Sequence, residues 1–453
     1  MIAMRLSDAS IPLQAELHGG DVPFVGVSTD TRTIRAGQLF VALRGPNFDA
    51  HEFVGAAADA GAVAAVVESE PKAAIPFLRV SDTRAAMGTL ASAWRQEFSL
   101  PLVAVTGSNG KTTVKEMVAA ILAQCGTVLS TKGNLNNDVG VPLTLFNLGA
   151  EHRFAVIEMG ANHPGEITRL CEIAKPTIAV ITLCAPAHLE GFGSIEGVAR
   201  AKGEIVTGLP ADGVAVLNAE DPYLDLWRKL AGNRRVITFG VSASADFNAR
   251  LHGAGAPERN RFTLVAPSGE VEIELALLGR HNVMNALAAA ACAYAAGADL
   301  NAIRAGLAVM HAVKGRLVTK MGVHGARLID DTYNANPASL RAAIDVLVKY
   351  PGQHWLVLGD MGELGTDAQA LHHEAGAEAK ALGVQRLFAI GSLSRATVAA
   401  FGNGGEHFTD MDALVSRLRD ELAHHSAERV TVLVKGSRAM QLERVVEAIV
   451  EPV

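Results

Sequence analysis

The chain has 453 residues, of which 49% are hydrophobic and 19% charged, and its formal net charge is −7. This length predicts about three domains, and this composition is sufficient for sizeable hydrophobic cores. The acidic balance disfavours a general nucleic-acid-binding protein, which would carry a basic surface.

Cysteine usage and the apolar stretches predict a cytoplasmic protein without a membrane partner. Cys125, Cys171, Cys184 and Cys292 are scattered without CxxC spacing, so reduced and mostly buried thiols are expected rather than a shared metal site. The most apolar stretch, 286–298, is too short to span a bilayer. The N-terminus lacks a basic segment followed by an apolar one, so no signal peptide is expected.

The first segment, about residues 1–99, combines short strand-like runs with alanine-rich helical patterns. Strands are expected near 38–43 and 63–67, and Pro101 marks the seam before the next segment. This pattern indicates a mixed α/β N-terminal domain.

The second segment, about 100–312, opens with the most informative run of the chain, Gly107-Ser108-Asn109-Gly110-Lys111-Thr112-Thr113. It follows the apolar run 102–105 and leads into a helical pattern, the strand–loop–helix context of a phosphate-binding loop. Glycines let backbone N–H groups approach phosphate oxygens, Lys111 can reach the outer phosphates, and the Thr112 hydroxyl can ligate Mg²⁺. The sequence therefore predicts a nucleoside triphosphate site.

One position departs from the usual phosphate-loop pattern. Val105 stands where the first glycine of G-x-x-x-x-G-K-[ST] would fall, and Gly107 becomes the flexible point instead. An ordinary glycine-rich turn with a surface lysine is the alternative, and the flanking strand and helix patterns favour the phosphate loop.

Strand-like runs then alternate with helical patterns through both remaining segments. In the second segment these runs lie at 155–157, 178–181, 214–217 and 236–239, followed by a β-rich patch at 262–265 and 271–275 and a helix from about Asn282. In the third, about 313–453, they lie at 327–329, 355–358, 387–390 and 431–434. Such alternation predicts parallel sheets covered by helices on both faces, hence a central P-loop ATPase domain and a Rossmann-like C-terminal domain.

Polar residues stand at several predicted strand ends, where parallel sheets bind ligands. They are Glu158, Asp330, Asp331, Asp360 and Lys435. Glu158 could face the phosphate loop and ligate Mg²⁺, a cation that prefers oxygen ligands. The alternative for such an acid is a solvated strand end.

Two residues of the second segment have both a structural and a functional interpretation. His188 follows a predicted strand in a glycine-rich loop, although a lone histidine is usually structural. Lys202 lies in a predicted helix, where a solvated surface lysine is the default. If Lys202 were desolvated beside metal ions, its neutral amine could take up CO₂ and offer carbamate oxygens to Mg²⁺.

Several weaker motifs could hold polar ligands. The loop with Asn134, Asn136 and Asn137 suits sugar, phosphate or peptide groups, or is an Asn-rich turn. Arg316 follows a glycine at the next domain seam and could bind phosphates as the domains close. A helix start at 279–282 and a loop at 331–337 could meet a base and a ribose. Each of these three motifs also has a structural explanation: a linker arginine for Arg316, a helix cap for 279–282 and an Asx turn for 331–337.

Together these motifs resemble the Mur ligase family, the ATP-dependent amide-forming enzymes of bacterial cell-wall precursor synthesis. The resemblance rests on 107–112, His281-Asn282 and the Asp331 loop. Within the family, further motifs resemble those of the branch that joins D-alanyl-D-alanine to a UDP-muramoyl-tripeptide. These lie at 28–32, 185–193, 201–204, 331–337, 359–365 and 434–438.

The resemblance implies a role for each motif residue, and the following assignments depend on it. The 107–113 loop would bind ATP phosphates, Thr112 and Glu158 would bind Mg²⁺, and His188 with a carbamylated Lys202 would serve a second Mg²⁺. Asn282, Arg316 and Asp331 would hold the nucleotide, with Lys111, His188, Lys202 and Arg316 as the catalytic group. Ser28, Asp30 and Arg32 would bind the UDP moiety, and Asn134, Asn136 and Asn137 the muramoyl-peptide.

The resemblance also implies a division of labour: 1–99 for the UDP substrate, 100–312 for ATP, and 313–453 for nucleotide and incoming dipeptide. Lys314 stands where a proline would be expected before Gly-Arg, which affects the geometry expected around Arg316. Three alternatives stay open: a sibling amino-acid-adding ligase, a folylpolyglutamate synthase and a P-loop switch ATPase.

Overall fold

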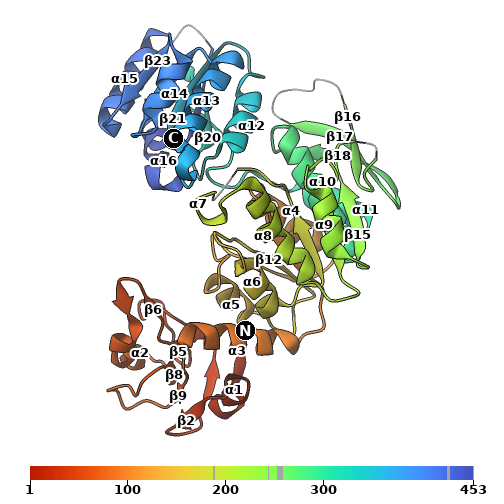
Figure 1. Cartoon of the computed structure of the whole chain (residues 1–453), viewed down its shortest axis with the longest axis vertical. Coiled ribbons are helices and arrows are strands. Elements are labelled where there is room, and N and C mark those ends of the chain that lie inside the picture. The colour runs from red at the N-terminus through yellow and green to blue at the C-terminus, as the bar shows by residue number, and fades with distance from the viewer. Residues whose placement is uncertain (187–188, 243, 253–258, 426–428, 452–453) are drawn as a thin grey trace.

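The computed structural model describes residues 1–186, 189–242, 244–252, 259–425 and 429–451. The chain forms an N-terminal, a central and a C-terminal lobe that follow one another along the longest axis (Figure 1). Over the described residues, each lobe is built around its own α/β sheet. The predicted α/β class is therefore confirmed.

The N-terminal lobe contains a sheet in the order β2-β9-β8-β5-β4, in which only β2 runs antiparallel to its neighbour among the described strands. Residues 64–67 form a fully buried strand. Its own residues are all Ala or Val, so both of its faces are apolar and can be buried. The strands are β1 (Ala3–Arg5), β2 (Glu16–His18), β3 (Pro23–Val25), β4 (Val27–Ser28), β5 (Leu39–Val41), β6 (Arg44–Gly45), β7 (Phe48–Asp49), β8 (Ala64–Val67) and β9 (Phe77–Arg79). The helices are α1 (Leu6–Leu13), η1 (Ala50–Phe53), α2 (Val54–Asp59) and α3 (Thr83–Gln96).

The central lobe contains a parallel sheet in the order β11-β12-β10-β13-β14-β15. Alternate residues of β10 enter opposite cores, because successive side chains of a strand point to opposite faces. Leu102 and Ala104 belong to the core on one face of the sheet, whereas Val103 and Val105 belong to the core on the other face. The strands are β10 (Leu102–Thr106), β11 (Val128–Ser130), β12 (Phe154–Glu158), β13 (Ile178–Ile181), β14 (Val214–Asn218) and β15 (Arg235–Phe239).

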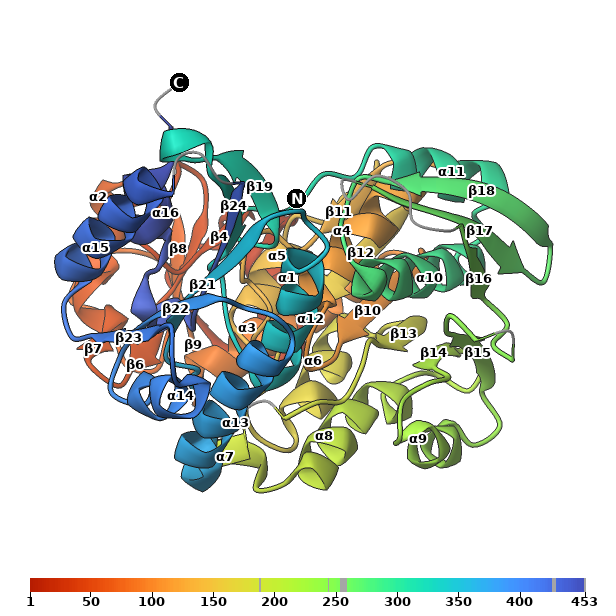
Figure 2. The ribbon, with the colours of Figure 1, turned by 90° about the horizontal axis from the view of Figure 1, so that it is seen from above.

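Helices cover both faces of the central sheet, and a smaller antiparallel sheet packs beside α10 and α11 (Figure 2). The helices are α4 (Lys111–Leu122), α5 (Gly140–Leu145), α6 (Glu166–Ala174), α7 (Leu189–Phe192), α8 (Ile195–Thr207), α9 (Leu224–Ala231), α10 (Arg280–Ala295) and α11 (Leu300–Ala308). The smaller sheet consists of β16 (Asn248–Leu251), β17 (Asn260–Ala266) and β18 (Gly269–Leu275). The helix expected from about Asn282 thus begins at Arg280.

The C-terminal lobe contains a sheet in the order β19-β20-β24-β21-β22-β23, with an antiparallel edge at β19. Its strands are β19 (Val318–Met321), β20 (Arg327–Asp331), β21 (Gln353–Gly359), β22 (Arg386–Ile390), β23 (Gly405–Phe408) and β24 (Val430–Lys435). The helices are η2 (Val323–Gly325), α12 (Pro337–Leu347), η3 (Gly365–Asp367), α13 (Ala368–Ala381), α14 (Ser394–Phe401), α15 (Met411–His424), η4 (Arg438–Met440) and α16 (Glu443–Ile449). The sequence patterns missed β19 and β23, which are edge strands with half-polar composition.

Two expectations need adjustment. Asp330 and Asp331 were expected after a strand but are its last two residues, because hydrogen bonding to β24 continues through Lys435. All four cysteines are free within the described residues, as predicted, but only Cys171 and Cys292 are buried.

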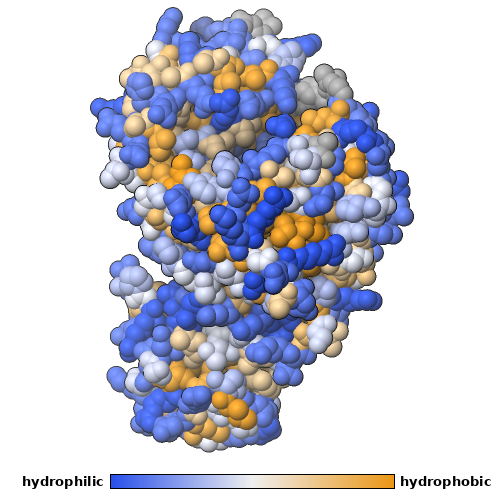
Figure 3. Space-filling view, turned by 45° about the vertical axis from the view of Figure 1, so that its right-hand side comes forward, coloured by the Kyte–Doolittle hydropathy of each residue, from blue (hydrophilic) through white to orange (hydrophobic). Residues whose placement is uncertain are grey.

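The surface is mixed. On the face seen in Figure 3, hydrophobic side chains form scattered patches between hydrophilic ones. Across the described ranges, no helix combines the length and the apolar composition needed to cross a bilayer.

Candidate active site

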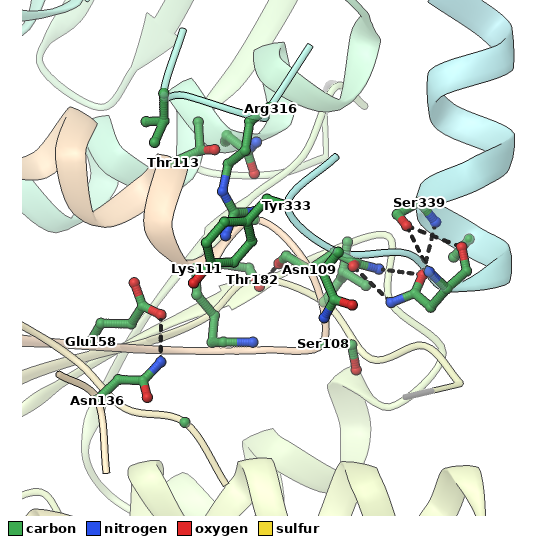
Figure 4. A pocket seen from close by; sticks show the side chains of 18 of the residues that line it. Ser108, Asn109, Lys111, Thr113, Asn136, Glu158, Thr182, Arg316, Tyr333 and Ser339 are labelled. Atoms are coloured by element: carbon green, nitrogen blue, oxygen red, sulfur yellow. Dashed lines mark hydrogen bonds between the residues drawn. The ribbon is translucent and has the colours of Figure 1, made fainter. Parts of the chain in front are cut away.

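A cavity of about 850 Å³ lies where the central and C-terminal lobes meet. Its wall combines the phosphate loop, the Asn-rich loop after β11, the start of α10 and the turn after β20 (Figure 4). The polar residues that line it include Ser108, Asn109, Lys111, Asn134, Asn136, Asn137, Glu158, Asn282, Arg316, Asp331, Asn336 and Lys435. The fold therefore gathers most of the predicted nucleotide and peptide residues in one place.

The phosphate loop depends on two glycines with positive φ. Gly107 has φ +146°, and a Cβ there would collide with the Thr182 hydroxyl. Gly110 has φ +82°, and its Cβ would come within 2.5 Å of Asn285 Oδ1. Val105, at the place of the usual first glycine, is a fully buried strand residue. Gly107 thus makes the turn, as predicted from the sequence.

Lys111 lies at the start of α4 with its side chain folded over this turn. Its Nζ donates to Gly107 O at 2.8 Å. Burial lowers the pKa of Lys111, with Arg316 adding to the shift and the carboxylates of Glu158 and Glu363 opposing it. A phosphate anion in the cavity would favour the charged form, so the amine is suited to a phosphate ligand.

Arg316 reaches the same point from the C-terminal side. Its Nη2 donates to Thr112 Oγ1 at 3.0 Å, and its guanidinium lies 4.4 Å from the centre of the Tyr333 ring (Figure 4). Its Nε is buried and has no hydrogen-bond acceptor within the part of the chain that the structure describes. A buried donor without an acceptor costs free energy, which an oxyanion would relieve.

Glu158 presents the opposite case, an acceptor without a donor. Its Oε1 accepts from Asn136 Nδ2 at 2.8 Å, but its Oε2 is buried and unpaired among the described residues. Together with the Thr112 hydroxyl, this carboxylate fits Mg²⁺, which takes few protein oxygens and completes its shell with phosphate oxygens and water. Within the described ranges, no group of three or more His, Cys, Asp or Glu residues forms a metal cluster.

Lys202 on α8 is only 1% exposed. Burial, followed by the charge of Lys111, lowers the pKa of Lys202 to about 7. Its Nζ lies 5.4 Å from the centre of the Phe192 ring. The surface-lysine alternative is therefore wrong, and the desolvation that a carbamate requires is present. Lys202 does not belong to the described lining of the cavity. His188 lies outside the described residues.

Three predicted nucleotide residues use their side chains for protein contacts. Ser108 Oγ donates to Ala185 O at 2.9 Å. Asn282 Nδ2 donates to Leu278 O at 2.7 Å. Asp331 forms a buried ion pair with Lys435 at 2.6 Å. These contacts fix the walls of the cavity; direct contact of the three side chains with nucleotide stays a prediction.

The three predicted peptide residues follow β11. Asn136 pairs with Glu158, and the Asn137 Oδ1 accepts from Gly140 N at 2.9 Å. Asn134 O accepts from the backbone of Asn136 at 2.8 Å. The loop is therefore an ordered cavity wall.

The 28–32 loop lies apart, at the end of β4 in the N-terminal lobe. The Arg32 guanidinium binds the Asp30 carboxylate with two nitrogens and, with the Arg32 backbone N–H, lowers the pKa of Asp30 to about 2. Ser28 Oγ donates to Asp30 O at 3.1 Å. Arg32 is 86% exposed and available to an anionic ligand.

An enzyme of Escherichia coli named UDP-N-acetylmuramoyl-tripeptide–D-alanyl-D-alanine ligase is 47% identical over 453 residues, which cover 100% of this chain and 99% of that relative. The chain belongs to the Mur ligase family. Three family models match in order: "Mur ligase family, catalytic domain" at 23–95, "Mur ligase middle domain" at 105–293, and "Mur ligase, glutamate ligase domain" at 315–438.

Solved structures agree with the Mur ligase assignment. A crystal structure of MurF from Acinetobacter baumannii has 35% identity and a TM-score of 0.94, covering 99% of this chain and 98% of that one. MurF ligase from Thermotoga maritima in complex with ADP has 27% identity and a TM-score of 0.83, covering 94% and 96%. A folylpolyglutamate synthase of Mycobacterium tuberculosis, at 19% identity with a TM-score of 0.67 and coverage of 82% and 94%, shares the fold alone.

One feature of this Mur ligase site has no signal in the sequence: a contact between the central and C-terminal lobes. Asn336, the N-cap of α12, exchanges two side-chain amide hydrogen bonds with Asn109 of the phosphate loop, at 2.8 and 3.2 Å. These residues are far apart in sequence, and an Asx cap explains Asn336 by itself. No local pattern could have predicted the pair.

Proposed function

We propose that this chain is an ATP-dependent ligase that joins D-alanyl-D-alanine to UDP-N-acetylmuramoyl-tripeptide in peptidoglycan precursor synthesis. The observation that carries the proposal is that a relative with this named activity matches the chain from end to end at 47% identity. The cavity supports it independently, because it combines cationic groups for phosphates with a wall of amide side chains for a peptide.

The first step is attack of the tripeptide's terminal carboxylate on the γ-phosphorus of ATP, which forms an acyl phosphate and releases ADP. Two anions must approach each other, so catalysis depends on positioning and charge neutralisation. Lys111 of the central lobe and Arg316 of the C-terminal lobe, whose Nε is unpaired among the described residues, supply positive charge at the same point of the cavity. The Asn134–Asn137 loop positions the peptide.

In the second step the dipeptide amine attacks the acyl carbonyl carbon, loses a proton, and phosphate leaves as the amide forms. Water would destroy the acyl phosphate, so the lobes must exclude it. The Asn109–Asn336 and Thr112–Arg316 contacts join the lobes beside the proposed phosphate position.

Two Mg²⁺ ions complete the proposed site, and they supply further neutralisation of phosphate oxygens when bound. Thr112 and Glu158 would hold the first, and His188 with carbamylated Lys202 the second. Support for the carbamate comes from the burial of Lys202 and its pKa of about 7, which make a neutral, CO₂-reactive amine accessible.

The domain roles follow from this chemistry. Residues 1–99, with Ser28, Asp30 and Arg32, would bind the UDP moiety. Residues 100–312 would bind ATP, and 313–453 would close over the nucleotide and bring in the dipeptide, with Asp331 and Asn282 of the two lobes at the nucleotide. We place the reaction in the cytoplasm, in support of cell-wall growth, cell shape, division and the cell cycle.

The test is mass spectrometry of the product formed from ATP, D-alanyl-D-alanine and a mixed pool of UDP-muramoyl peptides. The expected product is the tripeptide precursor extended by one dipeptide, with one phosphate released per amide and none when either peptide substrate is omitted. Extension by a single amino acid would indicate a sibling ligase, and extension of a folate a folylpolyglutamate synthase. Phosphate release without peptide substrates would contradict the ligase assignment and favour a switch ATPase.

A further inference from the structure

Lys115 is a buried cation that the reaction described above does not use. It lies one helical turn after Lys111 on α4, and its side chain is 1% exposed. Its neighbours on the helix, Val114, Met117 and Val118, are fully buried hydrophobic residues. An apolar side chain would fill this position without removing a charge from water, so packing does not explain the ammonium group.

The hydrogen bonds of Lys115 are directed to one backbone position. Its Nζ donates to Thr131 O at 2.9 Å and also to the carboxylate of Glu116, which is 40% exposed. Thr131 directly follows β11 and begins the segment that leads into the Asn-rich loop. The ammonium group therefore fixes the point at which the strand becomes the cavity wall.

From Thr131 the contacts continue to the proposed metal ligand. Thr131 Oγ1 accepts from Glu158 N at 3.0 Å, and Asn136 Nδ2 donates to Glu158 Oε1 at 2.8 Å. The loop is held at its far end as well, because Gly160 N donates to Asn136 O at 2.8 Å. Lys115 thus anchors the near end of a loop whose far end orients the carboxylate.

We propose that Lys115 is a positioning residue, which holds Thr131 so that Asn136 and Glu158 present the unpaired Glu158 Oε2 to the metal ion bound with ATP. The inference rests on the proposed function for the identity of that metal ion. Lys115 touches neither the cavity nor its ligands, and it acts through Thr131. Asn136 and Thr131, which bond Glu158 directly, are hydrogen-bond partners of the kind that orient metal ligands, and loss of such partners weakens metal binding by about 10–100-fold.

The test compares Mn²⁺ binding to the whole chain and to Lys115→Met, in the presence of a non-hydrolysable ATP analogue, by electron paramagnetic resonance. Methionine keeps the length and apolar stem of the side chain but removes the ammonium group. We expect about tenfold or greater loss of Mn²⁺ affinity, with a matching rise in the Mg²⁺ concentration needed for half-maximal ligase activity.

Arg95→Met is the matched control. Arg95 is also a buried cation that donates to backbone carbonyls, those of Ala174, Phe98 and Leu100, but it lies away from the cavity lining. We expect Arg95→Met to lower the melting temperature without changing Mn²⁺ affinity. A purely structural Lys115 would behave in the same way, which would overturn the proposal.

Thr131→Val is a second, independent variant, because it removes the hydroxyl that accepts from Glu158 N and keeps the β-branched shape. We expect weakened Mn²⁺ binding here too, and the double variant should lose less than the sum of the two single losses because both act on one chain of contacts. Unchanged Mn²⁺ affinity in Thr131→Val, or full additivity, would contradict the proposal. A wild-type chain that binds Mn²⁺ and the analogue but forms no amide would instead contradict the proposed function.

Discussion

The central and C-terminal sheets carry similar polar residues at their strand ends, but they treat them differently. In the central lobe, Glu158 Oε2 has no hydrogen-bond partner within the described ranges, and burial disfavours the charged form of Lys111. In the C-terminal lobe, Asp331 is paired with Lys435, and Asp360 accepts from the backbone N–H groups of α14.

This difference distinguishes side chains that are available to a ligand from side chains that stabilise the fold. Unpaired buried charges are unfavourable in the empty protein and become favourable when a ligand supplies the missing partner. Paired charges already have a partner without a ligand, and they fix the loops that carry them. We therefore expect central-lobe variants to lose activity with little loss of stability, whereas variants of the C-terminal pairs should lose stability, including at Asp331, which we also propose to lie at the nucleotide.

The largest effect is expected for Lys111→Ala. It removes a cation that neutralises the transferring phosphoryl group, so kcat should fall by at least about 10³-fold. Because burial disfavours the charged form of Lys111, removing this side chain should leave the melting temperature unchanged or raise it. Phosphate release measures kcat, and calorimetry measures the melting temperature. A Lys111→Ala variant with wild-type activity would contradict a catalytic role for the phosphate loop.

The next effect falls on stability. Lys435→Met leaves Asp331 buried without its cation, which should cost about 3–5 kcal/mol of unfolding free energy. A double variant, Asp331→Leu with Lys435→Met, should recover much of that loss because no unpaired charge remains. Denaturant unfolding measures both. A Lys435→Met chain of wild-type stability would contradict a scaffolding role for this pair.

A smaller loss, about 10–100-fold in kcat, is expected for Lys202→Ala, with partial rescue by short carboxylic acids that replace the carbamate. Activity in bicarbonate buffer should rise with pH through about 7, where the Lys202 amine becomes neutral. Steady-state rates with and without added acid check this. A fully active Lys202→Ala would reject the carbamate.

The same pKa predicts a stability trend with pH. The unfolded chain keeps the ordinary lysine pKa of 10.5, whereas folding lowers the pKa of Lys202 to about 7. Between these values the unfolded chain binds more protons, so the unfolding free energy rises with pH; below pH 7 the full cost of the buried charge is present. Lys202→Met should show a flatter melting profile from pH 7 to 10 than the wild type.

The smallest effect is expected for Arg32→Ala in the N-terminal lobe. Its ion pair with Asp30 is exposed, so the melting temperature should not change measurably. Loss of one charged hydrogen-bond donor should raise the KM for the UDP substrate by about tenfold and leave the KM for ATP unchanged. Equal changes in both KM values would contradict a separate UDP site.

The sequence predicted those parts of the site that are local. The 102–105 run, Gly107 and Lys111 are contiguous, and the strand–loop–helix context alone identifies them. Pairings across the fold were beyond sequence patterns: Asn109 with Asn336, and Asp331 with Lys435, join residues more than a hundred positions apart. The burial of Lys115 was missed for a similar reason, because the helix pattern alone does not show that β11 covers that face.

The central claim is that ATP activates the tripeptide carboxylate directly, and oxygen tracing tests it. The terminal carboxylate is labelled with ¹⁸O, and the phosphate released during ligation is analysed by mass spectrometry. We predict one ¹⁸O atom in each phosphate, because the acyl oxygen leaves with phosphorus when the amine attacks. Unlabelled phosphate alongside normal amide formation would contradict the account.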